Sequence, residues 1–157
     1  MAKMSILEAV KPKEDEPKPA KSMDKILQDL VNEMFSFYFK VHKYHWNVVG
    51  INFFDLHKMF GNMYEDVWED IDTTAEFIRA LGVMADIKPV MPPSNATGDM
   101  QMVADVLKAN QSLIDLLKTA EEAADYYENC DIENFIADRL KKHHKWNWQL
   151  SAFKGGK

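Results

Sequence analysis

The residues that break helices are gathered into short parts of this chain, and that distribution limits its fold more than any other feature. All six prolines lie either in the first 20 residues or between residues 89 and 93. The stretches 21–88 and 94–157 contain no proline and few glycines. Since proline interrupts the hydrogen bonding of a helix, such stretches predict long helices with few connections.

Apolar residues recur along these stretches at steps of three and four, the spacing of one helix face. Leu27, Leu30 and Val31 begin one such series, and Gly82 stands where a glycine commonly follows a helix end. The pattern predicts an all-α, ferritin-like four-helix bundle with a long middle crossover. The expected parts are a flexible N-terminal tail (1–21), a bundle over 22–153 with helices at about 23–48, 53–81, 99–128 and 131–153, and a C-terminal tail (154–157).

Composition excludes several classes of protein. The net charge of −6 disfavours a nucleic-acid binder, because phosphate contacts are made by Lys and Arg. A single cysteine, Cys130, excludes an intrachain disulfide and favours a reducing compartment. No apolar run approaches the ~20 residues that span a bilayer, and the N-terminus has no signal-peptide pattern. We therefore expect a cytoplasmic protein that does not enter membranes.

The candidate chemistry lies in metal-ligand residue types, since the sequence has no nucleophile-elbow, P-loop or dinucleotide-binding motif. His45 and His57 fall on the first two predicted helices, and Asp72 and Glu76 share one face of the second. His57 and Asp72 are 15 residues apart, about 22 Å along one straight helix. Either these groups form no site, or they meet across a subunit boundary through antiparallel pairing of two second helices.

Simpler interpretations exist for the neighbouring polar residues. Glu65, Asp66, Glu69 and Asp70 form an acidic run, which on a helix is usually a solvated face. The adjacent pair His143–His144 is flanked by lysines and is interpreted as a polar helix surface rather than as a ligand set. Haem binding through His and Met is a weak alternative, because Met at helical spacing is usually core filler.

One stretch of local sequence is specific. It reads His45–Trp46–Asn47–(x2)–Gly50–(x2)–Phe53–(x2)–Leu56–His57–(x2)–Phe60–(x3)–Tyr64 and continues to Asp72–(x2)–Ala75–Glu76. Together with Arg79–Ala80–Leu81–Gly82 and the segment 143–150, it resembles the Dps-type mini-ferritins over roughly residues 22–153.

That resemblance implies a hollow dodecamer of four-helix bundles, with ferroxidase sites between two-fold-related subunits. His45 and His57 match the family's histidine ligands from one subunit, and Asp72 and Glu76 match the carboxylate ligands from the other. Trp46 matches a tryptophan beside the site, associated with electron transfer and radical quenching. The implied activity is oxidation of Fe(II) with hydrogen peroxide or O2, and storage of ferric iron.

The chain also departs from the family pattern. Where the family usually carries Asp or Glu, four residues after the second histidine, this chain has Gly61. Glu65, one turn further along, is a possible substitute ligand. Iron is the expected metal, in a site of one or two ions, and zinc suits the same imidazoles.

Two further expectations follow from the resemblance. Asp131, Glu133 and Asp138 are candidates for a metal-entry pore, although Asp131 is equally a candidate N-cap. The alternative function is a DNA-binding, DNA-compacting shell whose metal chemistry is weakened by Gly61. The N-terminal tail (1–21), which would contact DNA, carries five lysines against four acidic residues, so that its net charge is small.

Overall fold

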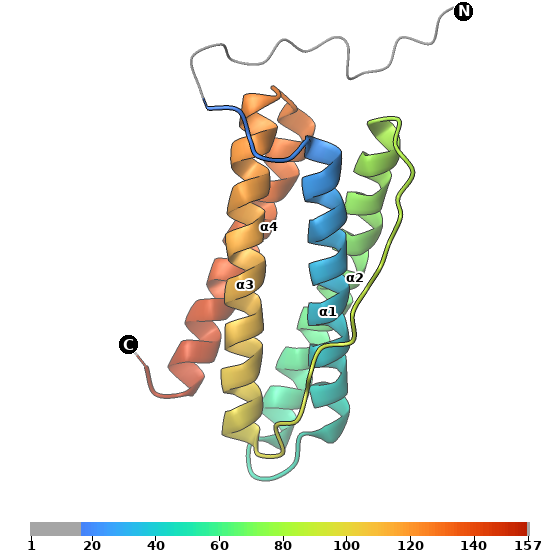
Figure 1. Cartoon of the computed structure of the whole chain (residues 1–157). Helices are drawn as coiled ribbons and strands as arrows, with labels where there is room; N and C mark the ends of the chain where they lie inside the picture. Colours follow the sequence, from blue (N-terminus) through green and yellow to red (C-terminus); the bar gives the residue numbers. More distant parts are fainter. Residues whose placement is uncertain (1–16, 157) are drawn as a thin grey trace, which may run out of the picture.

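The computed structural model describes residues 17–156 and confirms the all-α prediction, since this part of the chain holds four long helices and no strand. They are α1 (Met23–Asn47), α2 (Phe53–Ala80), α3 (Asp99–Tyr126) and α4 (Cys130–Phe153). Short links join α1 to α2 and α3 to α4, and a crossover as long as the bundle joins α2 to α3 (Figure 1). The predicted ferritin-like topology is therefore present.

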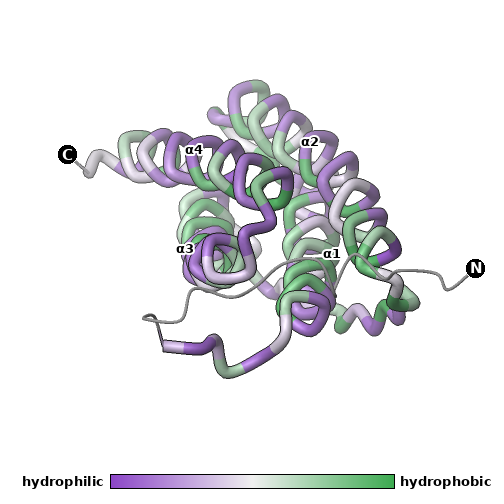
Figure 2. The backbone as a smooth tube through the Cα atoms, turned by 90° about the horizontal axis from the view of Figure 1, so that it is seen from above, coloured by the Kyte–Doolittle hydropathy of each residue, from purple (hydrophilic) through white to green (hydrophobic). Residues whose placement is uncertain are grey.

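Apolar side chains on the inward faces of all four helices form one core. Seen along the bundle, hydrophobic and hydrophilic residues alternate along each helix, as expected for helices with one buried face (Figure 2). Burying each large side chain contributes about 1.5–3 kcal/mol. The completely buried members include Leu27, Leu30, Val31, Met34, Leu56, Phe60, Met63, Val67, Ile78, Val103, Val106, Leu113, Leu117, Ile136 and Leu150.

Glycine sets the end of α2. Gly82 has a φ of +82°, a conformation that glycine adopts without the steric cost of a Cβ atom. Its N–H donates to the carbonyl of Arg79, and the N–H of Val83 donates to that of Ile78. These two bonds satisfy carbonyls that the last turn leaves open, and they turn the chain back along the bundle.

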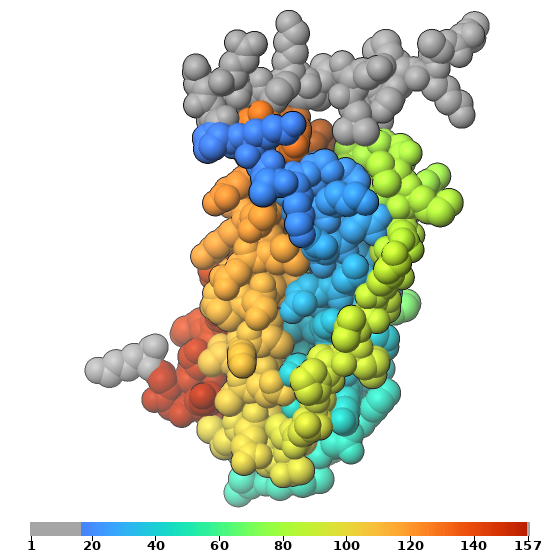
Figure 3. Space-filling model, viewed as in Figure 1, coloured from blue at the N-terminus to red at the C-terminus, as the bar shows by residue number. Residues whose placement is uncertain are grey.

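The crossover follows α1 closely, although it has no regular secondary structure (Figure 3). A series of polar side chains from one face of α1 binds its backbone, and we call this series the crossover ladder. The ladder bonds are Gln28 to Met84 O (2.8 Å), Asn32 Oδ1 to Lys88 N (2.7 Å), Ser36 to Val90 O (3.0 Å), Lys40 to Pro93 O (2.9 Å) and Lys43 to Ser94 O (2.8 Å).

The ladder is anchored by a buried ion pair between helices. The Lys40 ammonium group is nearly inaccessible and lies 2.7 Å from an Asp105 carboxylate oxygen of α3. The Tyr44 hydroxyl donates to the other oxygen of Asp105 and accepts a bond from the N–H of Ala96. Burial, reinforced by Asp105, raises the pKa of Tyr44 to about 12. This cluster therefore ties α1, α3 and the end of the crossover together.

The ends of the chain are only partly described. Most of the predicted tail 1–21 lies outside the described residues, as does Lys157 of the predicted C-terminal tail. Of the described residues, Lys21 pairs with Asp29 of α1 at 2.5 Å. None of the four described helices has the length and apolar character needed to cross a membrane.

Candidate metal centre

Two histidines meet where α1 ends and α2 begins. The link between these helices is short, with Gly50 at a φ of +100°, and it brings His45 of α1 beside His57 of α2. Their rings stack with centroids 3.7 Å apart and planes 22° apart. Both residues are half-buried.

Reciprocal hydrogen bonds fix the orientation of this histidine pair. The Nδ1 of His45 donates to the carbonyl of His57 at 2.7 Å, and the Nδ1 of His57 donates to the carbonyl of His45 at 2.8 Å. Because a carbonyl can only accept, each Nδ1 must carry the proton. In the neutral ring, Nε2 then keeps its lone pair, which is the arrangement of a metal-binding imidazole whose other nitrogen is held by the protein.

Gly61 lies directly against the histidine pair. A Cβ atom at this position would stand 3.3 Å from Cε1 and 3.4 Å from Nδ1 of His45. The first contact is tighter than nine in ten real Cβ contacts, so the His45 ring would have to shift by a few tenths of an ångström. The absence of a side chain at residue 61 therefore fits the position of His45, because the His45 ring packs against the backbone of α2 at Gly61.

Asp72 and Glu76 lie on α2 at a distance from the histidines. Both are exposed, one turn apart on the same face of the helix. Since α2 is continuous from Phe53 to Ala80, Asp72 lies about 22 Å along it from His57. Within residues 17–156, no three His, Cys, Asp or Glu side chains come together as a metal site. One chain thus carries two separate pairs of candidate ligands.

The other two residues expected near the metal site, Trp46 and Glu65, are both exposed. Trp46 is 65% exposed, and its ring lies 4.1 Å from that of His42. Glu65 is exposed one turn beyond Gly61, where its Oε1 lies 3.5 Å from the Tyr64 hydroxyl. Burial, reinforced by the nearby His45 and opposed by Glu65, lowers the pKa of His42.

The pore candidates lie at the start of α4. Asp131 and Asp138 are exposed, and Glu133 is half-buried. The N-cap of α4 is Asn129, so that the interpretation of Asp131 as a cap is wrong. Because the helix begins at Cys130, Asp131 stands within its first turn, where a carboxylate interacts favourably with the helix dipole.

The acidic run on α2 is only partly a solvated face. Asp70 is 5% exposed, and Arg139 of α4 donates to its two oxygens at 2.8 and 3.0 Å. Burial raises the pKa of Asp70 to about 6, although the Arg139 guanidinium opposes that rise. Asp66 also contacts Arg139, at 3.4 Å. The sequence-based interpretation was wrong for Asp70 because the partner lies on a distant helix.

The interpretation of His143–His144 as a polar surface was wrong for the first residue. His143 is completely buried, and its Nδ1 lies 2.6 Å from Oδ1 of Asn110, while His144 is exposed. Burial and nearby cations lower the pKa of His143 to about 3. Its ring therefore stays neutral and serves as a hydrogen-bonded part of the core between α3 and α4.

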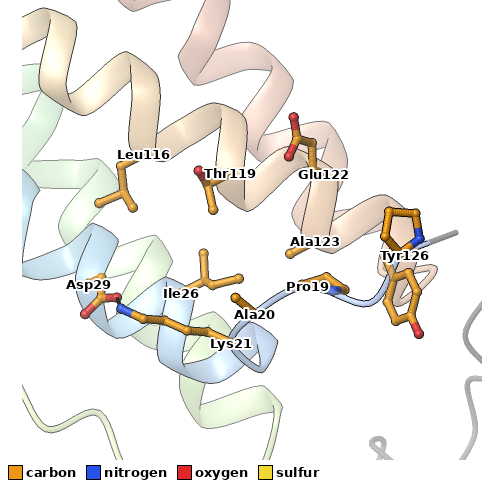
Figure 4. A pocket seen from close by; sticks show the side chains of 11 residues that line it. Pro19, Ala20, Lys21, Ile26, Asp29, Leu116, Thr119, Glu122, Ala123 and Tyr126 are labelled. Carbon is orange, nitrogen blue, oxygen red and sulfur yellow. Dashed lines mark hydrogen bonds and ion pairs between the residues drawn. The ribbon is translucent and has the colours of Figure 1, made fainter.

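A pocket of about 420 Å³ lies at the opposite end of α1 from the histidine pair (Figure 4). Ile26, Leu116, Ala123 and Tyr126 give it a mainly apolar lining, and its carboxylates, Asp29 and Glu122, come from different helices. It contains no histidine or cysteine, so it does not provide the donors of a transition-metal site.

The fold has counterparts among known proteins. Residues 24–155 match the ferritin-like domain family, and the chain belongs to it. A DNA protection during starvation protein of Brevibacillus brevis is 34% identical over 127 residues, which cover 74% of this chain and 83% of that protein. DNA protection during starvation protein 2 of Bacillus anthracis is 30% identical over 85% of this chain and 97% of its own length.

Solved structures of Dps proteins have the same fold. A Dps protein from Bacillus brevis is 26% identical, with a TM-score of 0.71 over 85% of this chain and 97% of that one. Dps from Staphylococcus aureus is 24% identical, with a TM-score of 0.80 over 87% and 97%. Within the ferritin-like family, the chain is thus a Dps-type mini-ferritin.

Proposed function

We propose that this protein binds Fe(II), oxidises it with hydrogen peroxide and stores the ferric product, which limits oxidative damage in the cytoplasm. The supporting observation is the histidine pair, in which two backbone carbonyls hold both Nδ1 protons and leave both Nε2 atoms free to bind metal. Imidazole and carboxylate ligands suit Fe(II), and an incomplete set of ligands leaves a position for peroxide.

Each proposed site forms between two subunits. His45 and His57 come from one chain, and Asp72 and Glu76 come from a two-fold-related copy. Along α2 the two pairs are about 22 Å apart. An antiparallel α2 of a second copy would place its carboxylate pair beside the histidine pair of this chain. Exposed apolar side chains next to both pairs, Trp46 (65%), Phe54 (82%) and Trp68 (54%), offer a surface that such a partner would bury.

The complete assembly is proposed to be a dodecamer, with Asp131, Glu133 and Asp138 as candidate lining of its entry pores. Glu65 remains a candidate substitute ligand for the carboxylate that Gly61 lacks. Zinc is proposed as a competitor at the same imidazoles.

Mixing two inactive variants tests the shared site. One variant carries His45→Ala and His57→Ala, and the other carries Asp72→Ala and Glu76→Ala. Each alone should oxidise Fe(II) at least tenfold more slowly than wild type. Co-expressed and randomly paired, they should restore about a quarter of the sites, because half of the pairs are mixed and each mixed pair has one intact site.

The controls separate this result from general damage. His144→Ala combined with Asp115→Ala removes an exposed histidine and an exposed carboxylate elsewhere, and should leave oxidation unchanged. No recovery in the mixed assembly would mean that the four residues do not act across a boundary. Wild-type rates in a variant lacking all four ligands would refute the proposed ferroxidase.

A DNA-binding shell remains the second candidate, supported by the name shared by the relatives, DNA protection during starvation protein. The acidic net charge of −6 opposes it, but twelve tails would act together. A gel-shift titration at low and moderate salt, with full-length protein and a variant lacking residues 1–16, tests this function. Absence of a shift at low salt would exclude it.

A further inference from the structure

A continuous series of aromatic rings runs along the outer side of α1 and α2, and we call it the aromatic face. It begins beside the histidine pair, where the ring of Tyr64 lies 5.1 Å from that of His45. The ring of His42 stacks on that of Tyr64 with centroids 3.9 Å apart, and it lies 4.1 Å from that of Trp46, tilted by 43°. These three rings are therefore in direct contact.

The series continues away from the histidines. Tyr38 follows Tyr64 with centroids 5.9 Å apart, and Trp68 follows Tyr38 at 5.3 Å. Trp68 precedes Asp72 by four residues on α2, which is one helical turn, and both line the same surface pocket. The rings thus connect the histidine end of one chain to its own carboxylate end, with no gap between neighbouring centroids above 5.9 Å.

The composition of this face is unusual for packing alone. Four of its members, Trp46, Tyr64, Tyr38 and Trp68, are the side-chain types that lose a single electron most readily, apart from cysteine. Both tyrosines also have a proton acceptor nearby, since the Tyr38 hydroxyl lies 3.1 Å from Nδ1 of His42 and the Tyr64 hydroxyl lies 3.5 Å from Oε1 of Glu65. Oxidation of a tyrosine to its neutral radical requires such an acceptor.

Resting on the proposed function, we propose that the aromatic face carries an electron between the two iron sites of a two-fold pair. In that pair, the histidines of one chain belong to one site and its carboxylates belong to the other. The rings of each chain, from Trp46 to Trp68, therefore join the two sites. The proposal takes each site to hold one Fe(II), because Gly61 has no side chain where the family usually carries a carboxylate.

Reduction of one peroxide to water needs two electrons, and a site that holds one Fe(II) supplies only one of them. One Fe(II) gives peroxide one electron, which breaks the O–O bond and yields Fe(III), hydroxide and a hydroxyl radical. A second electron completes the reduction, so that two Fe(II), one peroxide and two protons give two Fe(III) and two water molecules. The aromatic face supplies that second electron from the Fe(II) of the other site. Each ring is oxidised by one neighbour and reduced by the next, and each tyrosine regains its proton.

The first test needs no iron. Azide radicals generated by pulse radiolysis oxidise the tryptophans of the metal-free assembly. In wild type, part of the tryptophan-radical absorbance should decay as tyrosyl absorbance grows, in a first-order step independent of protein concentration. A Tyr38→Phe/Tyr64→Phe variant should lose most of this step, while Tyr127→Phe, a half-buried tyrosine off the aromatic face, should keep it. Equal transfer in the double variant would overturn the proposal.

The second test measures the products of iron oxidation. Protein loaded anaerobically with one Fe(II) per subunit receives limiting hydrogen peroxide, and hydroxyl radical is counted by spin trapping. Wild type should oxidise two Fe(II) per peroxide with little radical. Tyr38→Phe and Trp68→Phe should approach one Fe(II) per peroxide with several-fold more radical, whereas Trp148→Phe should match wild type.

The two tests separate the relay from the ferroxidase. Fe(II) binding should be the same in all these variants, because each keeps a ring and removes no candidate ligand. Unchanged stoichiometry and radical yield in Trp68→Phe would overturn the relay while leaving the ferroxidase in place. Oxidation that does not depend on His45, His57, Asp72 and Glu76 would overturn the ferroxidase, and with it the coupling, even where the metal-free transfer is observed.

Discussion

Two faces of α1 differ in whether their side chains find partners within the same chain. The crossover ladder uses polar side chains spaced by about four residues, and each finds its partner within the chain. The aromatic face uses rings from α1 and α2, and its ends remain open, with Trp46 65% and Trp68 54% exposed. One face therefore completes the subunit, while the other is the face that we propose a second copy covers.

The largest expected effect comes from placing a charge on the aromatic face. Trp68→Glu should break the two-fold contact, because burying an unpaired carboxylate there costs about 3 kcal/mol or more. Size-exclusion chromatography with light scattering should show a smaller particle, with helical content retained. Trp68→Phe, which keeps an apolar ring, is the matched control and should assemble normally. A full-sized Trp68→Glu particle would show that this face is not an interface.

The next effect comes from removing the anchor of the crossover ladder. Asp105→Ala leaves the buried Lys40 ammonium group without its carboxylate and Tyr44 without its acceptor. The free energy of unfolding should fall by about 2–3 kcal/mol, which lowers Tm by roughly 4–12 °C at fixed protein concentration. Asp115→Ala, an exposed site on the same helix, should change Tm by less than about 2 °C. Equal Tm values for the two variants would contradict a role for the anchor.

A smaller effect is expected from one step of the ladder. Asn32→Ala removes the acceptor of the Lys88 N–H, a single exposed bond worth about 1 kcal/mol. Hydrogen exchange at the Lys88 amide should become roughly fivefold faster, while amides in the middle of α1 keep their rates. An unchanged rate at Lys88 would mean that the crossover holds its position without this bond.

The smallest effect concerns the charge on His42 within the aromatic face. Because burial lowers its pKa, the ring should stay neutral at pH values where an ordinary histidine is half protonated, near 6.5. As pH falls through 6.5, the unfolded chain gains this proton before the folded one does, so stability falls, and His42→Phe should reduce that fall. An NMR titration of the His42 ring checks the direction. A midpoint at or above 6.5 would contradict it.

The sequence predicted the fold well because helices depend on local periodicity, which single residues such as Leu27 and Gly82 display. It identified His45 and Gly61 as important but not their contact, because ring packing onto a helix backbone depends on the crossing of α1 and α2. Asp70 and His143 were assigned to the surface because their partners, Arg139 and Asn110, are distant in sequence. The aromatic face was missed as a series, although Trp46 and Tyr64 were noted as positions of the family motif, because ring contacts between α1 and α2 depend on how the two helices cross.

The crossover ladder also limits how this segment can change in length. From Gln28 to Lys43 the helix rises about 22 Å, while the crossover advances from Met84 to Ser94 beside it. Inserting or deleting one residue between two bonds would move every later carbonyl away from its donor. Surface loops ordinarily tolerate insertions well, because loop closure entropy grows slowly with length. Relatives that keep these polar residues on α1 should therefore vary this segment by substitution and conserve its number of residues.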